Sequence, residues 1–65
     1  MKIGLTQRVE FNKNHHERRD ALDQEWIKLL TSIDLFPVPL PNQTINVEEY
    51  ILNLNLQGVI LTGGN

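Results

Sequence analysis

Cysteine is absent from this chain of 65 residues, and only two residues are histidine. A chain without thiols has no disulfide bonds and no thiolate nucleophile, and two histidines provide few ligands for a metal. Short domains usually need such cross-links, a metal or oligomerisation, because a chain of this size buries only about 60% of its unfolded surface. We therefore expect a marginal core and no cofactor.

An excess of charge and a long apolar run are also missing. Six basic and eight acidic residues give a net charge of −2, without a basic face for nucleic acid or an anionic membrane. After Lys2 the apolar stretch at the N-terminus ends at Thr6, far too short for a signal peptide or a membrane span. These features favour a cytoplasmic protein with neither nucleic acid nor membrane as a partner.

Apolar residues in the first half of the chain predict a strand, a loop and a helix. Ile3 and Leu5 alternate in a strand over 2–6, and the polar stretch 7–17 predicts a loop at its carboxyl end. From 18 to 33 the large apolar residues recur at helical spacing, which predicts a helix with one buried stripe: Leu22, Trp26, Leu29, Leu30 and Ile33.

The second half predicts a strand, a helix and a strand. Prolines alternate with apolar residues over 36–41, which favours a strand at or near an edge of the sheet, because proline has no N–H to pair. Asn46 followed by Glu49 predicts the N-cap of a short helix. The apolar run 58–62 is typical of a strand buried on both faces. Alternation of this kind implies a parallel sheet, and two helices are too few to cover it, so we expect a C-terminal continuation.

Two glycines, Gly63 and Gly64, follow the last predicted strand directly. Ligands of open α/β sheets bind at the carboxyl ends of strands, and glycine lets backbone N–H groups approach a ligand closely. A simple tight turn is the alternative interpretation. A phosphate-binding turn is another, but it requires a helix to begin immediately afterwards.

Four segments, taken in order, resemble the N-terminal part of class I glutamine-amidotransferase-like hydrolases, in the branch of gamma-glutamyl and gamma-glutamyl-GABA hydrolases. They are IGLTQR at 3–8, RDALD at 19–23 with Trp26, PVPLP at 37–41 and GVILTGGN at 58–65. The resemblance implies that residues 1–65 form the N-terminal portion of a single domain with a flavodoxin-like α/β fold, here the incomplete β-α-β-α-β part.

The same resemblance implies an activity: a cysteine nucleophile, helped by a histidine and a glutamate, attacks a gamma-glutamyl amide or glutamine and forms a thioester. Backbone N–H groups of Gly63 and Gly64 are then expected in the oxyanion hole. The triad lies further along in the family, so this stretch alone should be inactive. The expected partner is a small gamma-glutamyl compound, and the residues choose neither a particular substrate nor hydrolysis over ammonia transfer.

Other polar residues have open assignments. Arg8 and Asn65 are candidates for substrate binding, although Arg8 is equally suited to pair with Glu10 or Glu17. His15 and His16 are expected to be solvated. Asp20 and Asp23 are expected to be exposed or to lie at a helix start, and Trp26 in the core.

A different class of function is the alternative. The chain would then be a truncated, non-catalytic product or a docking module whose exposed apolar strands bind a partner subunit, an oligomer or the remainder of its own domain.

Overall fold

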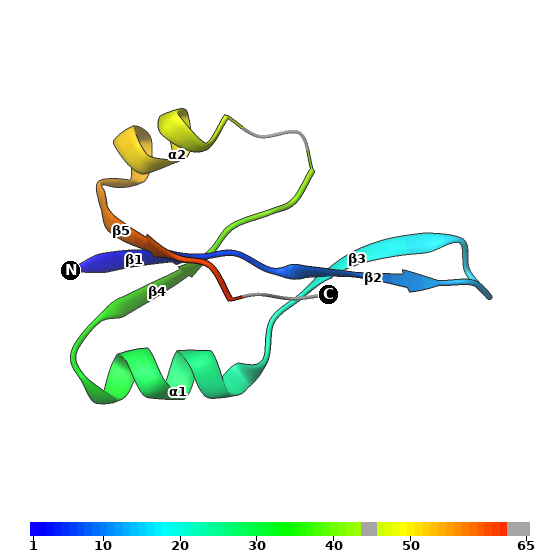
Figure 1. Ribbon diagram of the computed structural model, residues 1–65, viewed down its shortest axis with the longest axis horizontal. Helices are drawn as coiled ribbons and strands as arrows, with labels where there is room; N and C mark the ends of the chain where they lie inside the picture. The colour runs from blue at the N-terminus through cyan, green and yellow to red at the C-terminus, as the bar shows by residue number, and fades with distance from the viewer. Residues whose placement is uncertain (44–45, 63–65) are drawn as a thin grey trace.

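The centre of the fold is a parallel sheet of three strands (Figure 1). The computed structural model describes residues 1–43 and 46–62. Strand β1 (Lys2–Leu5) lies between β4 (Phe36–Pro39) and β5 (Leu56–Ile60), so that the spatial order is β4-β1-β5. Both pairings are parallel, which confirms the predicted α/β class and its parallel sheet.

Proline explains why β4 has a neighbour on one side only. The N–H groups of Phe36 and Leu40 donate to carbonyl oxygens of the β1 side, Met1 and Leu5, at 2.8 and 2.9 Å. Pro37 and Pro39 alternate with these donors, so the outer edge of β4 has no N–H at either position. The edge position predicted from the proline pattern is therefore confirmed for β4 in this sheet.

One helix lies on each side of the sheet (Figure 1). On the side of α1 (Gln24–Ser32), Ile3 and Leu5 form a buried cluster with Leu30 of that helix, and Trp26 packs against it half-buried. The side of α2 (Val47–Leu54) receives Gly4 instead. A Cβ at Gly4 would lie 3.1 Å from methyl groups of both Leu40 and Leu56, so these side chains fill the space above the glycine.

Side-chain caps set the beginning of both helices. The Asp23 carboxylate accepts from the N–H of Glu25 at 2.9 Å, and Asn46 Oδ1 accepts from the N–H of Glu49 at 3.3 Å. The second cap confirms the predicted short helix. The first corrects the longer one, because α1 begins at Gln24 and not at 18.

Residues 8–21 form an antiparallel hairpin, which corrects two predictions at once. Strands β2 (Arg8–Asn12) and β3 (Glu17–Ala21) occupy the predicted loop at 7–17 and the predicted start of the helix at 18. The Asn12 side chain accepts from the N–H groups of Asn14 and His15 and closes the turn. Four of the five residues of β3 are charged, and charged residues have low strand propensity, so local propensity does not predict this strand.

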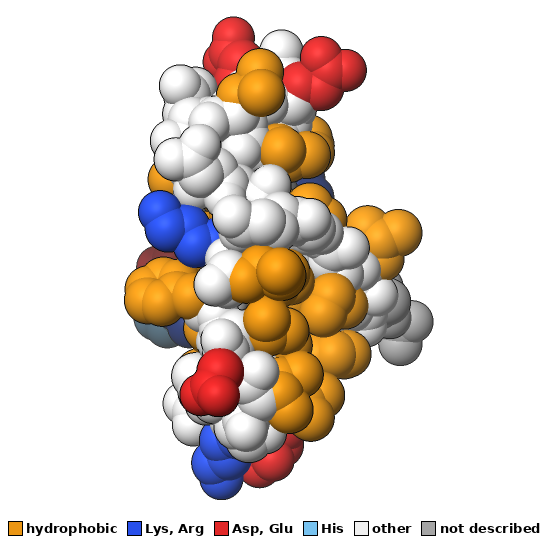
Figure 2. All heavy atoms as spheres, turned by 90° about the vertical axis from the view of Figure 1, so that its left-hand side faces the viewer, with side chains coloured by type: hydrophobic (Ala, Val, Ile, Leu, Met, Phe, Trp, Pro, Cys, Tyr) orange, Lys and Arg blue, Asp and Glu red, His pale blue; other side chains and the backbone are white. Residues whose placement is uncertain are grey.

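Several apolar side chains remain exposed. Leu29 and Ile33 are 52% and 57% exposed, so the stripe of α1 predicted to be buried is only partly covered. Strand β5 begins at Leu56 and ends at Ile60, and its residues 58–60 are half-buried, unlike the fully buried strand predicted at 58–62. Apolar side chains gather over the middle of the face seen in Figure 2. Within the described ranges, neither helix has the length and apolar character to cross a membrane.

Candidate functional site

The carboxyl ends of β1, β4 and β5 meet at one edge of the sheet, where hydrogen bonds join them. The N–H of Thr6 donates to the carbonyl of Ile60 at 3.1 Å, and the N–H of Leu40 donates to the carbonyl of Leu5 at 2.9 Å. The Gln7 side chain donates to the carbonyl of Leu40 at 2.8 Å. The edge expected to bind ligands is therefore a connected, ordered surface.

Thr6 and Thr62 form a reciprocal pair at the end of β5. The N–H of Thr62 donates to Thr6 Oγ1 at 2.9 Å, and Thr62 Oγ1 donates to the Thr6 carbonyl at 2.7 Å. Both bonds are partly buried, and they hold the residue that directly precedes Gly63. Gly63, Gly64 and Asn65 lie outside the described residues, so their roles in an oxyanion hole and in substrate binding stay predictions.

Arg8 lies beside Thr62 at this edge. The two residues line a small pocket of about 50 Å³ together with Leu22 and Trp26. Arg8 Nη2 is 2.7 Å from Glu10 Oε1, so one of the two pairings expected for this arginine is formed, whereas Glu17 pairs with Arg19. An exposed ion pair contributes only about 0–1 kcal/mol, so a substrate carboxylate can replace Glu10 at low cost. Substrate binding by Arg8 stays a prediction.

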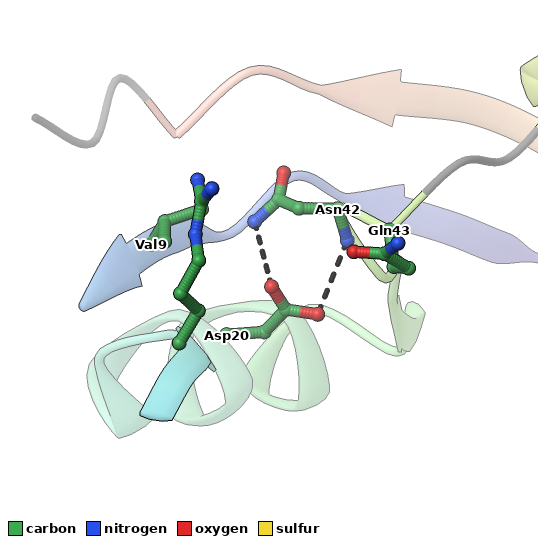
Figure 3. A pocket seen from close by; sticks show the side chains of 5 residues that line it. Val9, Asp20, Asn42 and Gln43 are labelled. Atoms are coloured by element: carbon green, nitrogen blue, oxygen red, sulfur yellow. Dashed lines mark hydrogen bonds between the residues drawn. The ribbon is translucent and has the colours of Figure 1, made fainter. Parts of the chain in front are cut away.

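Asn42 is the residue at this edge that the sequence did not point to. Its backbone N–H and its Nδ2 donate to the two carboxylate oxygens of Asp20 at 3.1 and 3.0 Å (Figure 3). Asn42 Nδ2 also donates to the carbonyl of Gln7 at 2.9 Å. These bonds attach the hairpin to the loop after β4. No local signal could have shown them, because the bonds join residues 22 and 35 positions apart.

Two cavities share Asn42 in their walls. One, of about 280 Å³, is also bordered by Thr6, Leu40 and Leu61 at the ends of the three strands. The other, of about 180 Å³, is bordered by Arg18 and Asp20 of β3 and is drawn in Figure 3. The edge therefore offers two adjoining hollows, one near the end of β5 and one bordered by β3 and the segment after β4.

The structure also shows where the histidine and aspartate residues of the hairpin region lie. His15 and His16 are exposed in the turn of the hairpin, as expected. Among residues 1–43 and 46–62, no three or more His, Asp or Glu side chains gather as metal ligands. Asp20, expected to be an exposed or helix-start charge, is an exposed residue of β3 that serves as an acceptor for Asn42. Asp23 does lie at a helix start.

A comparison with characterised proteins identifies one relative. The chain is 42% identical over 67 aligned positions to gamma-glutamyl-CDP-amidate hydrolase from Campylobacter jejuni subsp. jejuni. The alignment covers 100% of this chain and 32% of that hydrolase, so the chain spans about a third of its length. No protein-family model matches the chain, and no solved structure matches it significantly. The similarity confirms the resemblance to gamma-glutamyl hydrolases that the ordered motifs indicated.

Proposed function

We propose that this chain is the N-terminal part of a glutamine-amidotransferase-like enzyme that hydrolyses a gamma-glutamyl amide bond. The observation that carries the proposal is the 42% identity, along the whole chain, to a hydrolase of a gamma-glutamyl amidate. The parallel sheet supports it, because β5 ends at Ile60 at the carboxyl edge, with only Leu61 and Thr62 before the two glycines.

In this proposal the chain supplies one wall of the active site and the nucleophile comes from residues beyond 65. A cysteine thiolate attacks the gamma-carbonyl, the C–S bond forms, and the C–N bond breaks as the leaving nitrogen takes a proton. Water then cleaves the thioester and releases glutamate and the thiol. Each attack places negative charge on the carbonyl oxygen, and backbone N–H groups of Gly63 and Gly64 would stabilise it.

The proposed substrate carries a nucleoside diphosphate on the nitrogen of its gamma-glutamyl amide. That is the substrate class in the name of the similar hydrolase. Glutamine itself is the simplest competitor, since it has the same acyl group and no nucleotide. A preference for the nucleotide-linked compound over glutamine would separate a hydrolase of this class from an enzyme that uses glutamine as an ammonia source.

The test uses the complete protein encoded by the gene. We expect a downstream strand followed by a glycine-flanked cysteine at the start of a helix. The purified enzyme should release glutamate from gamma-glutamyl amides, and replacement of that cysteine by alanine should abolish release while the protein remains folded by circular dichroism. A complete protein without any cysteine would remove the assignment.

A non-catalytic docking function is a second candidate, favoured by a specific observation. Leu52 of α2 and Leu61 after β5 are 75% and 79% exposed, so each offers a partner subunit a large apolar side chain to bury. If residues 1–65 act by docking, the purified chain should associate with itself or with a partner subunit. A monomer with sharp, dispersed amide signals in NMR spectra would contradict docking.

A further inference from the structure

The β2–β3 hairpin has two faces, and on one of them the charges are internally paired. Arg8 bonds Glu10 at 2.7 Å, and Arg19 bonds Glu17 at 2.6 Å. Each partner is two residues away on the same strand and therefore on the same face. Two of the three arginines of the hairpin are thus neutralised by neighbouring carboxylates.

The opposite face carries Arg18, the third arginine. Among the described residues Arg18 forms no ion pair. The residue directly opposite Arg18 across the hairpin is Phe11, which is 56% exposed. Directly opposite residues of an antiparallel pair have Cβ atoms about 5 Å apart, so the guanidinium and the ring lie within reach of one ligand. An arginine without a partner beside an exposed ring is a suitable combination for a nucleotide.

Asp20 is the acidic residue on this face, two positions from Arg18. Both of its carboxylate oxygens accept hydrogen bonds from Asn42, and Figure 3 shows the group turned toward that residue. The carboxylate offsets part of the charge of Arg18. It leaves the five N–H donors of the guanidinium available, because no bond joins the two side chains.

We propose that Arg18 and Phe11 bind the nucleoside diphosphate of the substrate, with Arg18 on the phosphates and Phe11 stacked on the base. This proposal rests on the proposed function. The planar fork of arginine matches phosphate oxygens, and a phenyl ring stacks on the π-face of any base. The hairpin then selects the substrate by binding its nucleotide, and the carboxyl ends of the sheet strands bind the gamma-glutamyl group.

The adjoining cavities give a path between these two regions. Arg18 borders the cavity of about 180 Å³, Leu61 borders that of about 280 Å³, and Asn42 borders both. Because Asn42 borders both cavities, a substrate with its carbonyl at the end of β5 can extend its leaving group along them toward Arg18.

The experiment compares Arg18→Ala with Arg19→Ala in the complete protein. The two arginines are adjacent in β3 and equal in charge, but they lie on opposite faces, and only Arg19 is ion-paired. Binding of CDP is measured by isothermal titration calorimetry. We expect Arg18→Ala to weaken CDP binding about 10- to 100-fold, as for the loss of a charge-assisted hydrogen bond, and Arg19→Ala to weaken it less than about threefold.

Two further variants test the geometry. Arg18→Lys keeps the charge but not the fork, so it should recover only part of the affinity. Phe11→Ala should weaken CDP binding about 5- to 100-fold through loss of stacking. Thermal unfolding of each variant checks that the protein is folded. Equal losses in Arg18→Ala and Arg19→Ala, or unchanged CDP binding in Arg18→Ala, would overturn the proposal.

Hydrolysis assays separate this proposal from the proposed function. Arg18→Ala should raise the KM for a gamma-glutamyl amide of a nucleoside diphosphate and leave hydrolysis of gamma-glutamyl p-nitroanilide unchanged. Parallel losses on both substrates would contradict a role in nucleotide binding. If the complete protein cleaves neither compound, the hydrolase assignment fails, whereas binding of CDP through Arg18 is still decided by calorimetry.

Discussion

Thr62→Val tests whether the threonine pair at the end of β5 positions the two glycines proposed to form the oxyanion hole. Valine has a similar shape but cannot donate, so the variant loses the bond of 2.7 Å from Thr62 Oγ1 to the carbonyl of Thr6. That carbonyl lies in a partly buried position and is left without this donor. Such a loss lowers the free energy of unfolding by about 1–3 kcal/mol.

The catalytic rate should fall as well. Thr62 directly precedes Gly63, so a looser end of β5 displaces the N–H proposed to bind the oxyanion. Complete loss of one such donor lowers kcat by about 100- to 1000-fold, which sets the upper limit. We expect kcat for gamma-glutamyl amides to fall at least about tenfold, with a smaller change in KM, because oxyanion contacts strengthen in the transition state.

Thr31→Val is the matched control. Thr31 Oγ1 also donates to backbone carbonyls, at 2.8 Å to Ile27, but it lies on the exposed surface of α1. The complete enzyme is assayed by steady-state kinetics, and unfolding by urea gives the stability. The reasoning is refuted if Thr62→Val keeps the wild-type kcat, or if Thr31→Val loses as much.

Three other predictions concern stability and are measured by chemical unfolding or amide exchange in the complete protein. Gly4→Val should lower the free energy of unfolding by about 1–3 kcal/mol, because a Cβ there lies 3.1 Å from two leucine methyl groups. Gly58→Ala, whose Cβ meets only Ile3 at 3.5 Å, should lower the free energy of unfolding much less. Equal losses of stability in the two variants would contradict the packing argument. Asn46→Ala should cost about 1 kcal/mol through loss of the N-cap of α2, whereas Asn53→Ala, exposed within the same helix, should not destabilise it. Asp20→Ala should speed amide exchange across the hairpin, since it removes both bonds to the loop after β4, and unchanged protection would show that other contacts hold the hairpin.

Local sequence patterns were sufficient to predict the strands of the parallel sheet and the second helix. Alternating Ile3 and Leu5, the prolines of β4 and the cap at Asn46 each act through the backbone or side chain of the element itself. Such signals are present in the residues that form the element, and they do not depend on what packs against it. The order of the elements then implied a parallel sheet, as observed.

The hairpin could not be predicted in this way. In β3 the sequence ERRDA has neither β-branched nor aromatic residues, and it continues without a break into the apolar periodicity that begins at Leu22. What makes it a strand is pairing with residues 8–12, together with the bonds from Asn42 to Asp20. The boundary of the first helix was misplaced for the same reason, since the cap at Asp23 competes with a longer apolar pattern.

By itself the sequence determined the parallel α/β class and the edge position of β4. These follow from interactions between residues close together in the chain and from the chirality of strand connections. Only the tertiary structure decided that Thr6 holds Thr62, that Asn42 joins the hairpin to the sheet, and that Arg18 and Arg19 face opposite ways. Those features depend on contacts between distant residues, whose partners are chosen by folding and cannot be read from local composition.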